Sequence, residues 1–124
     1  MPSHHQDRMS IEIQRILAEI LRNEIKDPRI SAGAVGVSRV EASGDISFAR
    51  VYFSILGSDE ERQDILRVLE KAKGFIRSQL ARRLQIRHVP ELEFRIDTSI
   101  EIGVRMSALL DELREMENGE GSQP

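Results

Sequence analysis

The residues best suited to chemistry in this chain are six cationic side chains in one short segment, residues 71–88, which contains no acidic residue. The remaining 106 residues carry 12 basic and 21 acidic side chains, so the net charge of −3 conceals one basic segment in an acidic protein. Such a segment can hold phosphate groups, and we predict a nucleic-acid contact there. The alternative is a solvated basic helix face that binds nothing. The basic residues of the segment are Lys71, Lys73, Arg77, Arg82, Arg83 and Arg87.

Gly74 interrupts the helical pattern inside this basic segment. Apolar residues Ile65 and Leu69 recur at helical spacing before it, and Ile76 and Leu80 start a new apolar stripe after it. We therefore predict two helices joined by a kink at Ala72–Gly74. Because glycine has no Cβ, a phosphate could approach the backbone closely at Gly74, where the unpaired amides that open the second helix favour an anion. A kink without a ligand is the alternative.

The elements expected to position this segment form one α+β domain. We predict a helix over residues 4–26, ended by Asp27–Pro28, and a hairpin of two strands over residues 34–41 and 46–56. The two helices around the kink, a strand over 91–97 and a last helix follow. For elements in this order, a three-stranded sheet with helices packed on one face would bury their apolar side chains.

Alternation along the second strand divides its residues between two faces. Ala49, Val51, Phe53 and Ile55 are predicted to face the core, and Arg50 to lie on the opposite, more polar face. On that face we expect Tyr52 to make a cross-strand contact rather than to stack on a base, and Arg39 to join them. Arg50 is therefore a further candidate for RNA binding.

The C-terminal region is predicted to be acidic and helical. Apolar residues recur on one side of this helix, and Thr98 and Glu101 have the spacing of a helix cap. We expect one domain over residues 1–117, a disordered acidic tail over 118–124, and no contact of that tail with RNA because its charge repels phosphate. The apolar residues of the helix are Ile102, Met106, Leu109, Leu110, Leu113 and Met116.

Several classes of function have no residues to support them. The chain has no cysteine, which removes disulfides, thiolate metal sites and thiol nucleophiles. His4 and His5 are adjacent in sequence and His88 is distant, so we expect no metal site, no cofactor and no catalytic centre. With no apolar run of about 18 residues, we expect a cytoplasmic protein that does not enter the membrane. We also expect a monomer.

Several stretches of the sequence resemble one family, ribosome-binding factor A, in the same order over roughly residues 5–115. The architecture of a helix, a small-residue kink and a second helix with a basic flank is also that of KH domains, which clamp the backbone of about four nucleotides. The stretches that carry the resemblance are Ile25–Ile30, Ala49–Phe53, Gly74–Ser78, Val89–Phe94, Asp97–Glu101 and Arg105–Ser107.

The resemblance implies a type II KH-like fold with an added C-terminal helix, in which Ala72-x-Gly74 replaces the usual GxxG. It also implies a non-catalytic assembly factor that binds the free 30S ribosomal subunit and assists 16S rRNA processing and maturation, notably at low temperature. Whether ribosomal proteins are further binding partners is left open at this point. A protein-interaction module or a generic RNA-binding domain of KH-like fold is the alternative. The predicted RNA-binding residues are Lys71, Lys73, Gly74, Arg77, Arg82, Arg83, Arg87 and Arg50.

Overall fold

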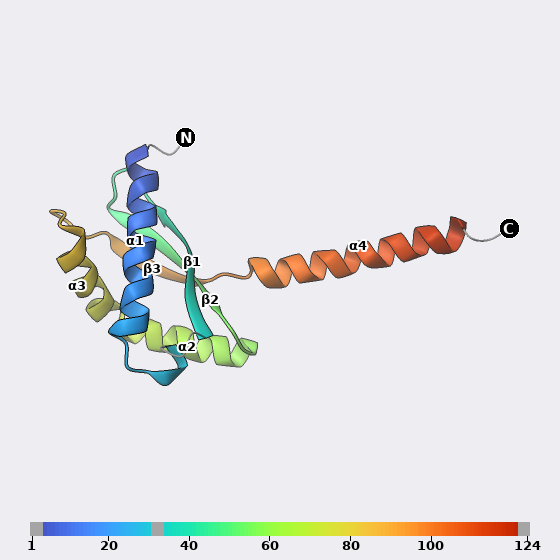
Figure 1. Cartoon of the computed structure of the whole chain (residues 1–124), viewed down its shortest axis with the longest axis horizontal. Coiled ribbons are helices and arrows are strands. Elements are labelled where there is room, and N and C mark those ends of the chain that lie inside the picture. The colour runs from blue at the N-terminus through green and yellow to red at the C-terminus, as the bar shows by residue number, and fades with distance from the viewer. Residues whose placement is uncertain (1–3, 31–33, 122–124) are drawn as a thin grey trace.

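A three-stranded sheet in the order β1-β2-β3 lies at the centre of the computed structural model, which describes residues 4–30 and 34–121. β1 and β2 are antiparallel, whereas β3 lies parallel to β2 after the crossover through α2 and α3 (Figure 1). The predicted α+β class and order of elements are confirmed. The elements are α1 (His4–Asn23), β1 (Val35–Ala42), β2 (Phe48–Ile55), α2 (Asp59–Lys71), α3 (Lys73–Leu84), β3 (Glu91–Ile96) and α4 (Ser99–Gly121).

The core lies between one face of the sheet and the helices α1, α2 and α3. Every second residue of β2 is buried, from Ala49 to Ile55, as the alternation predicts. The rings of Phe53 and Phe94 meet edge to face at 4.9 Å between centroids and join β2 to β3. α1 covers β1 and also contacts α3, so the basic segment is fixed against the first helix.

The predicted kink lies where α2 ends and α3 begins. Ala72 separates the two helices, with φ −87° and ψ 0°. Ser58 caps α2 in a complete capping box with Glu61, as the acidic residues of its first turn indicate. Gly74 is the second residue of α3, so it lies at the N-terminal end of this helix rather than at the junction itself.

Several predicted boundaries are displaced by one to three residues. α1 ends at Asn23 instead of residue 26, ahead of Asp27–Pro28. Asp27 instead accepts a hydrogen bond from the backbone N–H of Arg29 at 2.9 Å, which forms a turn after the helix. The sequence also predicts a helix cap at Ser3 and a loop at Ser31–Gly33, and both lie outside the described residues.

α4 extends away from the rest of the protein (Figure 1). It is helical to Gly121, so residues 118–121 belong to the helix, and residues 122–124 lie outside the described part of the chain. At its start, the Ser99 N–H donates to the Asp97 carboxylate at 2.8 Å, and Glu101 forms an ion pair with Arg62 of α2. The predicted helix is therefore present, but every side chain from residue 102 to 118 is exposed.

Candidate nucleic-acid interface

A groove of about 410 Å³ runs along α3 beside the segment that leads into β3. Three of its residues, Gly74, Ser78 and Ala81, are small and recur at steps of four and three residues, so they share one face of the helix. Their small side chains leave the space that forms the hollow. We call this feature the α3 groove; its lining residues are Gly74, Arg77, Ser78, Ala81, Arg87, His88 and Val89.

Gly74 is not required by the packing of the protein itself. A Cβ built on Gly74 would meet no atom within 4 Å, and Gly74 does not have a positive φ. Glycine inside a helix is less stable than alanine by roughly 0.5–1 kcal/mol. The fold therefore bears a small cost at this position without any gain in packing, and the open backbone faces the α3 groove.

Arg77 forms part of the groove wall but is held by the protein. Its guanidinium donates to the carbonyl oxygens of Val89 at 2.8 Å and Pro90 at 3.1 Å, and lies 3.3 Å from the Glu91 carboxylate. These contacts fasten the segment before β3 to α3. Arg77 therefore positions the wall of the groove, and its charge is partly balanced by Glu91.

Lys73 is directed toward the protein rather than toward solvent. Its Nζ lies 2.8 Å from the Glu70 carboxylate and 4.8 Å from the centroid of the Phe94 ring. A cation over an aromatic ring with an acidic partner is a stabilising arrangement in its own right. Lys73 thus lies next to the groove without lining it.

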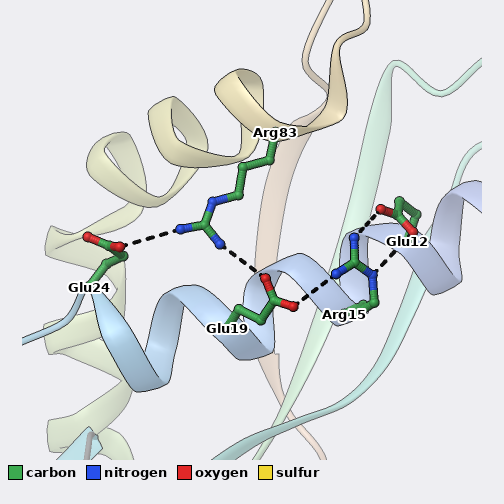
Figure 2. Close-up of polar contacts among 5 residues, drawn as sticks. All are labelled: Glu12, Arg15, Glu19, Glu24 and Arg83. Atoms are coloured by element: carbon green, nitrogen blue, oxygen red, sulfur yellow. Dashed lines mark hydrogen bonds and ion pairs between the residues drawn. The ribbon is translucent and has the colours of Figure 1, made fainter.

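Arg83 links α3 to Glu19 of α1 and to Glu24, the residue that directly follows α1 (Figure 2). Its guanidinium lies 3.3 Å from Glu19 and 3.4 Å from Glu24, and its side chain is only 30% exposed. Glu19 in turn accepts from Arg15 at 2.9 Å, and Arg15 also pairs with Glu12. This hydrogen bond from Arg15 lowers the pKa of Glu12. We call the five-residue chain of ion pairs the α1–α3 seam.

Three cations of the basic segment are exposed and have no acidic partner among the described residues. Lys71, Arg82 and Arg87 are exposed, and none of them forms an ion pair within residues 4–30 and 34–121. Arg87 lines the α3 groove, Lys71 ends α2 next to the kink, and Arg82 lies near the end of α3. Positive charge is therefore free at both ends of α3 and within the groove.

Arg50 lies apart from these residues. It projects from the face of the sheet opposite the helices and lies 3.4 Å from Glu93 of β3. On the same face, the Arg39 guanidinium stacks over the Tyr52 ring at 4.1 Å from the centroid. This confirms the expected cross-strand contact of Tyr52 and the position of Arg39, and it separates Arg50 from the α3 groove.

Four residues of the groove were not predicted as binding residues: Ser78, Ala81, His88 and Val89. The spacing of Gly74, Ser78 and Ala81 was a usable signal, because three small residues on one helix face predict a hollow beside the helix. His88 and Val89 carry no such signal, since only the tertiary structure brings the segment before β3 against α3.

Among residues 4–30 and 34–121, no group of three or more His, Asp or Glu side chains could hold a metal ion. None of the described helices is both long and apolar enough to cross a membrane.

The chain matches the family model of ribosome-binding factor A over residues 5–110. The ribosome-binding factor A of Syntrophomonas wolfei is 50% identical over 119 residues, which cover 96% of this chain and 98% of that protein. That of Desulforamulus reducens is 43% identical over 115 residues, covering 93% and 94%.

Solved structures of ribosome-binding factor A proteins also resemble this chain. An NMR structure from Thermotoga maritima, described as a ribosome-binding factor A, superposes with a TM-score of 0.69 at 40% identity, covering 82% of this chain and 94% of that one. The crystal structure of ribosome-binding factor A from Thermus thermophilus gives 0.63 at 31% identity, covering 73% and 93%. The chain therefore belongs to the ribosome-binding factor A family.

Proposed function

We propose that this protein is a non-catalytic assembly factor that binds the free 30S ribosomal subunit in the cytoplasm. Its role there is to assist processing and maturation of 16S rRNA, notably at low temperature. Family membership supports this function, and coordinates of the Thermus thermophilus ribosome-binding factor A have been fitted into the cryo-EM map of a 30S complex. The observation that carries the proposal here is the α3 groove, with its open backbone at Gly74 and free cations at both ends of α3.

In this proposal the groove holds the sugar-phosphate backbone of rRNA. A phosphate approaches Gly74, where the first amides of α3 are free of intrahelical partners and the helix dipole favours an anion. Arg87 faces the same hollow, and Lys71 and Arg82 extend the positive surface beyond it. Recognition of this kind reads the shape of the RNA backbone and not the identity of its bases.

The substitution Gly74→Ala tests the role of the open backbone. Because an added Cβ meets nothing within 4 Å, the free protein should fold normally and gain roughly 0.5–1 kcal/mol in unfolding free energy. Binding to purified 30S subunits should nevertheless weaken by about tenfold, since the methyl group occupies the space of the phosphate. Gly103→Ala is the matched control, because Gly103 is also helical with open space around it, and it should bind normally.

The binding assay should compare free 30S subunits, complete 70S ribosomes and an unrelated structured RNA over a series of salt concentrations. Preference for the free subunit, with affinity that falls steeply with salt, is the expected result. Equal affinity for the unrelated RNA would reduce the protein to a generic RNA binder. Affinity that does not depend on salt would favour a protein-interaction module instead. Gly74→Ala binding as well as the unchanged protein would exclude phosphate contact at the groove.

A further inference from the structure

The feature that RNA binding leaves unexplained is the apolar face of α4. Ile102, Met106, Leu109, Leu113 and Met116 recur at steps of four, three, four and three residues, and each of these side chains is 50–65% exposed. This spacing is that of the a and d positions of a coiled coil. A helix with such a seam needs an apolar surface to pack against.

In the described part of the chain, neither face of the sheet offers such a surface to α4. The face of the sheet opposite the helices is polar: Arg50 pairs with Glu93 across the strands, and the Arg39 guanidinium stacks over the Tyr52 ring. The other face is already covered by α1, α2 and α3. In Figure 1, α4 projects clear of the sheet along its whole length, so a partner helix could lie beside it without meeting the domain.

We propose that two copies of this chain associate through α4 in an antiparallel pair. When the seams are aligned about a centre between Ser107 and Ala108, Ile102 lies opposite Leu113 of the second copy and Met106 lies opposite Leu109 of the second copy. Each layer occurs twice because the pair is symmetric. Four apolar layers are then closed over the stretch from residue 102 to 113.

The charges beside the seam agree with this alignment. The a positions of this seam are Met106 and Leu113, and each is directly preceded by a charged residue, Arg105 or Glu112. In an antiparallel pair, residues that precede a positions face one another across the seam. Arg105 of each copy therefore lies beside Glu112 of the other, giving two equivalent opposite-charge contacts. Within residues 4–30 and 34–121 neither side chain has an ion-pair partner of its own chain.

The parallel arrangement is disfavoured by the same residues. It would place Glu112 of one copy beside Glu117 of the other, along a half of the helix that also carries Asp111 and Glu115. It would also bring both domains to the same end of the pair, whereas the antiparallel arrangement holds them at opposite ends. Charge and shape therefore both favour antiparallel pairing.

The contact extends over about two heptads, so the association is weak and reversible. Apolar a and d positions sustained over at least three to four heptads are typical of a full coiled coil, and this seam is shorter. The monomer expected from the sequence is then the state at low concentration, and dimers form as the concentration rises. This inference does not depend on RNA binding, because it involves a helix that lies outside the α3 groove.

Sedimentation equilibrium of the full chain from low to high micromolar concentration measures the association directly. We expect the mean mass to rise toward that of a dimer. Leu109→Gln with Leu113→Gln should keep the mass monomeric over the same range, because it removes the four apolar layers. A mass that stays monomeric for the unchanged protein would overturn the proposal, and so would a dimer that this double variant does not weaken.

Exchanging the two charges tests the alignment itself. Arg105→Glu alone, or Glu112→Arg alone, places like charges together at two symmetric contacts and should raise the dissociation constant at least tenfold. The double variant that carries both changes recreates the opposite-charge contacts and should restore the original value. Additive weakening in the double variant would show that these residues do not face one another, and would refute the alignment.

The absence of cysteine from the chain permits a test of direction. Copies with Ile102→Cys and copies with Leu113→Cys, mixed under mild oxidation, should form the mixed disulfide in preference to either homodimer. In a parallel pair each variant would instead cross-link to itself, and that outcome would contradict the antiparallel arrangement. Cross-linking of neither kind in a sample that sediments as a dimer would place the interface outside α4.

Discussion

Arg82 and Arg83 are neighbours in the basic segment, and the fold gives them opposite environments. Arg83 lies between the carboxylates of Glu19 in α1 and of Glu24, which directly follows α1, whereas Arg82 is exposed and forms no ion pair in the described part of the chain. The other cations of the segment divide in the same way. Lys73 and Arg77 are bound by groups of the protein, whereas Lys71 and Arg87 have no ion-pair partner among the described residues.

This division shows that a cluster of positive charge in a sequence is not one functional unit. A cation that faces a carboxylate of its own protein has part of its charge balanced and contributes to the fold. A cation without such a partner keeps its full attraction for phosphate. We therefore expect the two groups to separate in experiments that measure binding and stability together.

The largest expected effect is on binding, through the three free cations. Lys71→Glu, Arg82→Glu and Arg87→Glu in one chain should weaken binding to 30S subunits at least a hundredfold at about 0.1 M salt and flatten the salt dependence. Unfolding free energy should change by no more than about 1 kcal/mol, because these side chains are exposed. Filter binding over a salt series and urea denaturation measure the two quantities.

A control with the same change in net charge is available outside the basic segment. Arg22, Lys26 and Arg114 are also exposed and have no ion-pair partner among the described residues. Replacing these three by Glu should weaken binding only a few-fold. If both triple variants lose affinity equally, the effect is one of net charge, and the distinction between free and bound cations fails.

Arg77 should show the largest effect on stability. Arg77→Ala removes the donors that satisfy the carbonyl oxygens of Val89 and Pro90, at a cost of about 1–3 kcal/mol in unfolding free energy. The groove wall should loosen as a consequence, so that binding falls as well. Urea denaturation checks the first effect; an unchanged midpoint would mean that Arg77 belongs with the free cations.

The neighbouring pair Arg82 and Arg83 provides a smaller but more closely matched test. Arg83→Gln should lower the unfolding free energy by about 0.5–1 kcal/mol, because Glu19 and Glu24 lose a shared partner across the α1–α3 seam. Arg82→Gln should leave stability unchanged and weaken 30S binding. The reverse pattern in thermal unfolding would contradict the structural assignment of both residues.

The smallest effect is the pH dependence of the α1–α3 seam. The hydrogen bond from Arg15 holds the pKa of Glu12 below its usual value in the folded protein. Its contribution to stability is therefore complete above about pH 4.5 and is lost as the pH falls through the lowered folded pKa. Urea midpoints between pH 6 and pH 3 should fall less steeply for Glu12→Gln than for the unchanged chain; parallel curves would mean that this pair contributes nothing.

Sequence patterns predicted the fold well where the pattern within a single strand or helix is sufficient to define that element. Alternation predicted the buried face of β2, and the break between two apolar stripes predicted the kink at Ala72. The end of α1 was predicted less well, because the helix stops before the proline signal is reached. The boundaries of the domain and the assignment of the RNA-binding residues remain predictions.

The sequence by itself determined the element order, the core residues of the strands and the presence of a basic segment, because these follow from local periodicity and composition. Only the tertiary structure decided which cations are free, since Glu19 and Glu24 are about sixty residues from Arg83 in sequence. It alone also brought His88 and Val89 against α3 to form a groove, and left the seam of α4 uncovered. Periodicity shows which side of a helix is apolar, whereas the partner of that side depends on how distant elements pack.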